Sequence, residues 1–391
     1  MNIIFVSPFG LGQKTTVWAR TLPLARRLVE RGCQVTVLIP PWDTPADSGR
    51  CWVDAGVRVE NVSLAGGLPL VTARLLARVR ALKPEIVHVV KPRAHAGIVQ
   101  WILWQWRRLS GRGPRLILDV DDWEQAWSAI GGYSRLTARF LDWQERWGIT
   151  HADGVTAASC WLLETVGAGR PQMPILYLPN GIAAPPTSLR ADDRPTGAHP
   201  SLLLFSRFVE VEPAWMGEFW REIQRLRPGV RLVVAGKALQ PHREDAFRQA
   251  LAGDTSPVQW AGYVDKAQLA DLYATATCAI FPAADVPLNQ AKCSVRLATT
   301  LLNGVPVVAS AVGEQAHYGG HGAAKLVPAG ATPAAFAVAV GELLADPAAR
   351  QDQIVTARWR LLDEYDWARL GDALFDFYRN PPTDPARTAE K

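Results

Sequence analysis

Short apolar runs alternate with amphipathic stretches along the whole chain. In the first half, the apolar runs are "NIIFVS", "QVTVLI", "EIVHVV", "RLILDV" and "DGVTAAS". Continuous runs of this length are typical of strands that are buried on both faces of a parallel sheet. Between the first two runs lies "TTVWARTLPLARRLVERG", where Val17, Leu24, Leu28 and Val29 share one face and Gly32 ends the helix. The alternation predicts a doubly wound α/β domain.

The alternation stops at residues 183–200 and then restarts. The segment "AAPPTSLRADDRPTGAHP" is rich in Pro, Asp, Thr and Ala and has no periodicity, so we interpret it as an interdomain linker. Strand-like runs return as "SLLLFS", "RLVVAG", "PVQWAG", "CAIFPA", "VPVVAS" and "AKLVPA". We expect two Rossmann-like doubly wound parallel-sheet domains, residues 1–182 and 201–365. A helix at about 366–379 could pack back on the first domain, and residues 380–391 form a tail.

Ligands of such sheets bind outside the carboxyl ends of the strands. A cleft between the two domains is therefore the expected site. Neither classical phosphate-binding loop is present after the first strand. Gly10 and Gly12 are followed by Lys14 and Thr15 without the third glycine of G-x-G-x-x-G, and the P-loop pattern is absent. Glycine lets the backbone approach a ligand and Lys14 adds charge, although ordinary turn chemistry explains the glycines equally well.

Composition limits the class of protein. The chain has 391 residues, of which 48% are hydrophobic and 20% are charged, so two cores can form. No apolar run reaches the roughly 18 residues that span a bilayer. The N-terminus enters a strand without a basic leader. The five cysteines lack C-x-x-C spacing, which argues against a disulfide framework and a zinc site. We expect a cytoplasmic protein.

The positive charge is unevenly placed. The net charge is +5, and the segment from Arg74 to Arg115 holds ten basic residues against one acid, Glu85. Such a patch suits nucleic acid, an anionic membrane or an anionic substrate, and no nucleic-acid motif accompanies it. Within it, residues 96–112 combine three tryptophans with three arginines, which favours peripheral contact with the inner face of a membrane. A helix that packs on the sheet and has a basic end explains the pattern equally well.

The stretch "KCSVRLATTLLNGVPVVAS" (292–310) predicts a helix followed by a buried strand, and its helix start lacks acids. A helix N-terminus carries partial positive charge, yet this one opens with Lys292 and Arg296. These cations, the Ser294 hydroxyl and the free N–H groups would make an anion cradle. The alternative is that both cations are solvated and Ser294 is an N-cap. Cys293 lies where a thiolate is favoured, although packing is the simpler role.

Four segments carry a resemblance to a known family. They are "LPNGI" (178–182), "FSRF" (205–208), "VQWAGYVDKAQLADLYATATCAIFP" (258–282) and "NGVPVVASAVGE" (303–314), and in this order they resemble the retaining glycosyltransferases of family 4. The resemblance implies the GT-B fold, in which two Rossmann-like domains face each other across a cleft. It also implies a nucleotide-sugar donor, a glycan or lipid-linked acceptor, and no bound metal or cofactor.

The family pattern is only partly kept. Its Gly-Arg corresponds to Ser206-Arg207, and that Arg would hold the donor diphosphate. The family's Lys five residues later falls on Glu212, its paired glutamates fall on Ala291 and Thr299, and its mid-domain His falls on Asp121. The chain is therefore a divergent member by resemblance. Lys292 would replace the lost lysine, and a bound diphosphate would be the anion that the cradle lacks.

The segment "DVDDWE" (119–124) places four acids at the end of a strand. Its carboxylates could bind sugar hydroxyls or act as a base, with Asp122 and Glu124 on one side and Asp121 on the other. The alternative is a helix start with acids that suit the helix dipole. Metal binding is a minor alternative.

The resemblance assigns the remaining roles. We expect catalysis to rest on Asp121, Asp122, Glu124, Arg207 and Arg296, and the acceptor to meet Lys91, Arg93 and Trp123. We expect the donor to be bound by Gly12, Lys14, Thr15, Asn180, Ser206, Arg207, Gly236, Lys237, Gly262, Tyr263, Lys292, Cys293, Ser294, Arg296 and Thr299. A GT-B sugar-nucleotide epimerase and a non-catalytic nucleotide-sugar-binding protein remain as alternatives.

Overall fold

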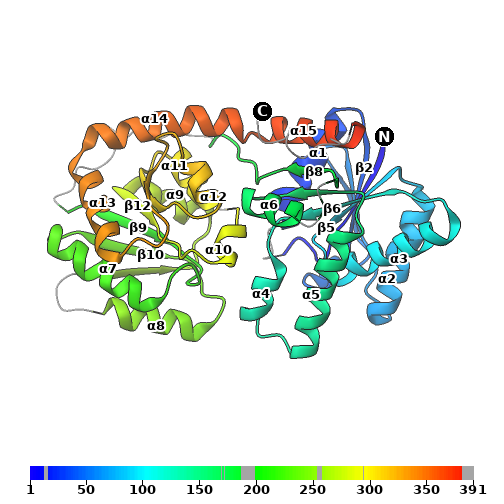
Figure 1. Cartoon of the computed structure of the whole chain (residues 1–391), viewed down its shortest axis with the longest axis horizontal. Coiled ribbons are helices and arrows are strands. Elements are labelled where there is room, and N and C mark those ends of the chain that lie inside the picture. Colours follow the sequence, from blue (N-terminus) through cyan, green and yellow to red (C-terminus); the bar gives the residue numbers. More distant parts are fainter. Residues whose placement is uncertain are drawn as a thin grey trace. The chain divides into compact units, whose positions relative to one another are not determined.

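The chain folds into two compact units, drawn in Figure 1. The computed structural model describes residues 1–12, 16–168, 170, 172–185, 199–252, 258–293 and 295–380. The first unit comprises Met1–Gly181, Ala291–Cys293 and Tyr365–Lys391, and the second comprises Ile182–Gln290 and Ser294–Glu364. Most of the expected linker, residues 186–198, and the tail from residue 381 lie outside the described residues.

The first unit is built on an eight-stranded sheet with the order β3-β4-β2-β1-β5-β6-β7-β8. All neighbouring strands are parallel except β3 and β4. The strands are β1 (Asn2–Val6), β2 (Gln34–Ile39), β3 (Cys51–Asp54), β4 (Val57–Asn61), β5 (Ile86–Val90), β6 (Arg115–Val120), β7 (Gly154–Ala157) and β8 (Ile175–Tyr177). The five apolar runs of the first half are strands, as predicted.

Helices cover both faces of this sheet. They are α1 (Leu22–Glu30), α2 (Gly67–Leu82), α3 (Ala94–Ser110), α4 (Glu124–Ile130), α5 (Arg135–Thr150), α6 (Cys160–Ala168) and α15 (Trp367–Arg379). A π-helical turn, Val17–Thr21, leads into α1, and a 3₁₀ turn follows β2 at Pro45–Asp47. One core forms between the sheet, α2 and α3, and the other between the sheet, α1 and α15. The last helix is therefore part of the first unit (Figure 1).

The second unit has a six-stranded parallel sheet with the order β11-β10-β9-β12-β13-β14. The strands are β9 (Ser201–Phe205), β10 (Arg231–Ala235), β11 (Val258–Gly262), β12 (Cys278–Phe281), β13 (Val307–Ser310) and β14 (Lys325–Val327). The helices are α7 (Pro213–Leu226), α8 (Pro241–Leu251), α9 (Lys266–Thr275), α10 (Pro287–Ala291), α11 (Val295–Leu302), α12 (Glu314–Gly319), α13 (Pro333–Ala345) and α14 (Pro347–Glu364). A cluster of buried apolar residues packs β9 and β10 against α7 and α13, and further buried apolar residues such as Leu297 and Leu301 lie on α11.

The predicted class, two doubly wound α/β domains, is confirmed. In the described part of the chain, no helix combines the length and apolarity needed to cross a bilayer. In both sheets the strands that carry candidate residues lie next to one another. Their carboxyl ends therefore form one edge in each unit, which is where ligands of such sheets bind.

Candidate functional site

The carboxyl edge of the first sheet gathers a cluster of buried charges. Lys91 follows β5, and its Nζ lies 2.8 Å from Asp121 Oδ1, 3.1 Å from Asp122 Oδ2 and 3.2 Å from Glu124 Oε1. Arg93 also pairs with Glu124 and donates to the Tyr133 hydroxyl. The side chains of Lys91, Asp121 and Glu124 are each at most 8% exposed. Two cations thus face three carboxylates, and all five residues are ones that the sequence assigned to catalysis or to the acceptor.

The arrangement of the acids differs from the expectation. We expected Asp121 to face away from Asp122 and Glu124, as in an extended strand. Instead all three converge on Lys91, because β6 ends at Val120 and the chain turns into α4 at Glu124. Trp123 is the residue before α4 and its ring meets Trp161 edge-on at 5.7 Å. The cluster is therefore made by a loop rather than by strand alternation.

Burial raises the pKa of two acids at this edge, Asp121 and Glu145. Removal from water raises the pKa of Asp121 to about 6, and Lys91 opposes the shift while Asp122 and Asp119 add to it. Burial likewise raises the pKa of Glu145 on α5 to about 7, although its carboxylate accepts N–H bonds from Glu124 and Gln125. Burial by itself would lower the pKa of Lys91, but the three carboxylates raise it. Asp121 thus has the protonation behaviour of a group that can accept or donate a proton near neutral pH.

A second buried ion pair lies beside the cluster. Arg20, from the π-helical turn before α1, pairs with Asp119 at 2.7 Å through Nη2 and donates to it at 2.8 Å through Nε. Its Nη1 donates to Asn180 Oδ1 at 3.1 Å. Arg20 is 1% exposed, and although burial disfavours a charged Asp119, Arg20 holds the pKa of Asp119 below its usual value. The pair fixes Asn180, a residue assigned to the donor, at the end of the first sheet.

The segment at residues 291–293 belongs to the first unit. The Asn180 N–H lies 3.0 Å from Cys293 Sγ, and Lys292 Nζ lies 5.2 Å from the centre of the Trp127 ring. Lys292 and Arg296, which the sequence groups in one cradle, thus have their partners in different units. Ser294 lies outside the described residues, and the helix begins at Val295.

The glycine loop after β1 holds a carboxylate. The Gly10 N–H donates to Asp43 Oδ1, and a Cβ built on Gly12 would lie 3.1 Å from Asp43 Oδ2. Asp43, which follows β2, therefore lies against the backbone of Gly10 and Gly12, where we expected the donor to bind. Lys14 and Thr15 lie outside the described residues, whereas the next residue, Thr16, donates to Asp121 Oδ2 at 3.1 Å.

At the carboxyl edge of the second sheet, the acid that is missing near α11 comes from the loop after β9. Glu210 accepts from Arg296 Nη2 at 3.0 Å, from the Ser206 hydroxyl at 2.7 Å and from the Val209 N–H at 3.1 Å. Arg296 also donates to the Phe205 carbonyl at 3.0 Å and lies over the Phe205 ring. The positive charge of Arg296 in the first turn of α11 is thus neutralised by Glu210, which is remote in sequence. We expected Arg296 either to wait for a bound anion or to be solvated, and the ion pair with Glu210 differs from both expectations.

Other candidate residues of this edge are exposed. Arg207, Lys237 and Tyr263 follow β9, β10 and β11, and all three side chains are exposed, Tyr263 by 76%. Gly236 has a φ of +127°, and a Cβ there would lie 1.9 Å from the Ser206 carbonyl oxygen. Only glycine allows this close approach between the β9 and β10 loops. Gly262 accepts from the Gly236 N–H through its carbonyl, and Thr299 on α11 is half-buried.

Arg243 is a further cation that contacts the loop after β9, and the sequence did not indicate it. It lies in the first turn of α8, donates to the Phe208 and Val211 carbonyls, and pairs with Glu212 at 3.1 Å. Glu212 is the position where the family places a lysine. Phe208 adopts a left-handed φ of +63° and is 1% exposed, so its ring anchors the loop. An arginine at the start of a helix gives no sequence signal that it will reach a loop 31 residues earlier.

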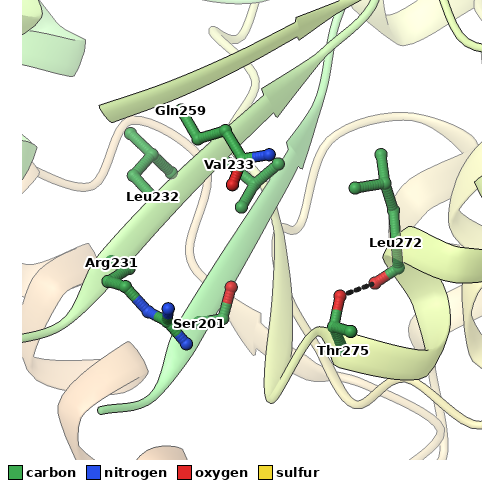
Figure 2. A pocket seen from close by; sticks show the side chains of 7 residues that line it. All are labelled: Ser201, Arg231, Leu232, Val233, Gln259, Leu272 and Thr275. Atoms are coloured by element: carbon green, nitrogen blue, oxygen red, sulfur yellow. Dashed lines mark hydrogen bonds between the residues drawn. The ribbon is translucent and has the colours of Figure 1, made fainter. Parts of the chain in front are cut away.

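A cavity lies at the opposite edge of the second sheet. It has a volume of about 480 Å³, and Figure 2 shows the side chains around it. Ser201 and Arg231 are the first residues of β9 and β10, so the cavity lies near the amino ends of the strands. It is lined by Ser201, Arg231, Leu232, Val233, Gln259, Leu272 and Thr275. None of these is a candidate residue, and ligands of parallel sheets bind at the other edge.

Comparison with known proteins identifies both units. Residues 15–181 match the model of a glycosyl transferase 4-like domain, and residues 199–346 match that of the glycosyl transferases group 1. Glycogen synthase of Mycobacterium tuberculosis is 26% identical over 257 residues. That match spans 63% of this chain and 59% of the relative's length.

Solved structures show the same fold. Sucrose-phosphate synthase from Thermosynechococcus elongatus superposes with a TM-score of 0.72 at 18% identity, covering 97% of this chain and 98% of the other. Anabaena HepE in complex with UDP-glucose gives a TM-score of 0.65 at 13% identity, covering 97% and 99%. This likeness shows the GT-B fold. The two domain matches, which together span most of the chain, show that it belongs to the glycosyltransferases of family 4 type, as a divergent member.

Proposed function

We propose that this protein is a retaining glycosyltransferase that moves a sugar from a nucleotide-sugar donor to a glycan, lipid-linked or small-molecule acceptor. The observation that carries the proposal is Arg207. It stands exposed at the carboxyl end of β9, at the position where the family resemblance places the arginine that holds the donor diphosphate. The two matching domain models, which span residues 15–181 and 199–346, support the same assignment.

The second unit would hold the donor. Arg207 and Lys237 are exposed cations at the ends of neighbouring strands, and Arg296 adds a partly neutralised charge behind them. In the proposed reaction the anomeric C–O bond to the diphosphate breaks, and negative charge develops on the leaving phosphate. Cations fixed beside that oxygen stabilise the transition state without a bound metal. UDP-glucose bound to HepE makes a nucleoside-diphosphate sugar the natural donor class to test.

The first unit would serve the sugar and the acceptor. Asp121 is held by Lys91 and Thr16 at the end of β6, and its raised pKa suits a hydrogen bond to a hydroxyl group. In the retaining reaction we propose, the acceptor oxygen bonds to the anomeric carbon on the face that the diphosphate leaves. The proton of the acceptor hydroxyl passes to the leaving phosphate. Lys91 and Arg93 then act by holding the acids in place, since their own charges are engaged within the cluster.

The test is a transfer assay with a panel of UDP-, GDP-, ADP- and TDP-sugars, with and without oligosaccharide and lipid-linked acceptors. We expect release of one nucleoside diphosphate that depends on an acceptor, activity that survives EDTA, and a product whose anomeric configuration by NMR equals that of the donor. Interconversion of the donor without an acceptor would identify an epimerase. Nucleotide binding without turnover across the panel would identify a binding protein, and an inverted product would contradict retention.

A further inference from the structure

A ladder of aromatic rings runs along one face of α5 in the first unit. Phe140, Trp143, Trp147 and His151 lie on or directly after α5 at spacings of three or four residues, so they share one face of the helix. Their ring centres are 5.8, 6.2 and 4.2 Å apart in sequence order. Trp104 on α3 continues the ladder, at 5.6 Å from Trp147. The rings thus form one surface across two packed helices.

Much of this surface is open to solvent. Phe140 and Trp143 are 43% and 44% exposed, and Leu136, one turn earlier, is 81% exposed. Exposed large apolar side chains that lie together mark a site of interaction with a protein, a ligand or a membrane. The buried face of α5 is a different one and carries Leu141, Gln144, Glu145, Gly148 and Ile149. Trp147 and His151 contact Trp104 and so help to pack α5 on α3, whereas the N-terminal part of the ladder, Phe140 and Trp143, is left exposed.

Arginines form a row beside the ladder. Arg135, Arg139 and Arg146 are exposed and lie next to the aromatic positions on α5, and Arg108 lies 5.6 Å from the Trp104 ring. In the described part of the chain, no carboxylate pairs with Arg135 or Arg139, and α3 contains no acid. The acids of α5 are Asp142, which is half-buried, and Glu145, which is fully buried. The surface is positively charged as well as aromatic.

The ring geometry distinguishes between occupants. Phe140 on Trp143 and Trp147 on His151 are stacked, with interplanar angles of 25° and 8°. Rings that cover each other's faces leave edges, not faces, for a sugar to stack on, and neutral sugars have no use for a row of arginines. A bilayer interface suits both features, because tryptophan and arginine favour the headgroup level and anionic lipids attract the charge.

We propose that the ladder (Phe140, Trp143, Trp147, His151 and Trp104) and its arginine row dock this protein on the surface of an anionic lipid bilayer. The surface is mainly on α5, rather than on the α3 segment that the sequence singles out. If the acceptor of the proposed function is lipid-linked, docking would bring the enzyme to the membrane that holds the acceptor. The docking itself needs neither donor nor acceptor, so it can fail or succeed independently of that function.

The test is co-sedimentation of the full chain with phosphatidylcholine vesicles, with or without phosphatidylglycerol. An arginine near an anionic surface contributes about fivefold to partitioning. We therefore expect the double variant R135Q/R139Q to bind the anionic vesicles roughly 20-fold more weakly, and F140A/W143A to lose at least as much. A matched control, R358Q/W359A, removes an exposed arginine and a 75% exposed tryptophan from α14 of the second unit and should bind within about twofold of the unchanged protein.

High salt should release the unchanged protein. Circular dichroism establishes that each variant is folded. Three results would overturn the proposal: no binding to anionic vesicles, equal binding by the unchanged protein and the α5 variants, or equal binding to neutral vesicles. A dimer that F140A/W143A converts to a monomer, or retention on immobilised glycan that those variants abolish, would assign the ladder to another occupant.

Discussion

The charged side chains at the carboxyl edge of the first sheet are mostly buried, whereas several at the carboxyl edge of the second sheet are exposed. In the first unit, Lys91, Asp121 and Glu124 are buried, Asp122 is half-buried, and all three carboxylates pair with Lys91. In the second, Arg207 and Lys237 are exposed at strand ends, and Arg296 pairs with the half-buried Glu210. A buried network that is already satisfied gives a rigid arrangement, whereas exposed cations are available to a ligand. We therefore expect the first edge to be the more rigid of the two and the second to be the more accessible to a ligand.

The largest expected effect is a loss of stability when the shared cation of the first edge, Lys91, is removed. Lys91→Met leaves Asp121, Asp122 and Glu124 without their shared cation, and removing one partner of a buried charge network costs about 3–5 kcal/mol. We expect urea unfolding to show a loss of that size. The matched change Lys237→Met removes an exposed lysine from the second edge and should stay within about 0.5 kcal/mol. Equal losses in the two variants would contradict the contrast between the edges.

The pH dependence of stability sharpens the comparison. Burial raises the pKa of Glu145 from 4.5 to about 7, so the native state holds this proton more tightly than the unfolded chain does. The resulting stability is fully present below pH 4.5 and is lost as the pH rises through 7. Relative to Glu145→Gln, the unchanged protein should lose roughly 3 kcal/mol across this window.

Unfolding midpoints measured at several pH values provide the readout. The variant Glu212→Gln, at a carboxylate that is 75% exposed in the second unit, controls for the loss of one negative charge. A difference between the unchanged protein and Glu145→Gln that stays constant with pH would rule out the raised pKa.

A smaller effect is expected at the second edge. Glu210 neutralises Arg296, so Glu210→Gln should strengthen nucleoside-diphosphate binding by about fivefold, the value of one charge pair near the surface. Fluorescence titration measures the affinity. Glu212→Gln in the same loop should change it less, because that acid is exposed and already paired with Arg243. Weaker binding by Glu210→Gln would show that the carboxylate itself contacts the ligand or shapes the loop.

The sequence predicts the strands well because burial on both faces leaves continuous apolar runs. It misses β3, where "CWVD" at the sheet edge alternates exposed and half-buried positions. It also misses β4, where "VRVEN" is interrupted by polar residues, and β8, which has only three residues. The candidate residues that follow strands are found for the same reason, since the runs locate the strand ends. Lys91 and the "DVDDWE" acids meet because β5 and β6 are neighbours.

The partners of the buried charges could not be predicted. Arg20 and Asp119 are 99 residues apart, and Arg296 and Glu210 are 86 apart, so only the folded topology brings them together. The absence of an acid from the start of α11 is a real feature of the sequence. It does not show whether a ligand or a distant glutamate supplies the negative charge, and the structure provides the glutamate. The sequence does not indicate that Glu145 is buried or that its pKa is raised, because a glutamate on an amphipathic helix normally faces solvent.

We propose that the carboxyl edge of the second sheet binds the donor diphosphate through Arg207. Calorimetric titration of UDP, GDP and ADP into Arg207→Ala and Arg231→Ala tests it directly, since both are exposed arginines of one sheet, at the carboxyl end of β9 and the amino end of β10. A charge-assisted hydrogen bond is worth about 1.5–3 kcal/mol. We predict that Arg207→Ala weakens the preferred nucleotide roughly 10- to 100-fold and that Arg231→Ala leaves it unchanged. Unchanged affinity in Arg207→Ala, or a loss confined to Arg231→Ala, would contradict the account.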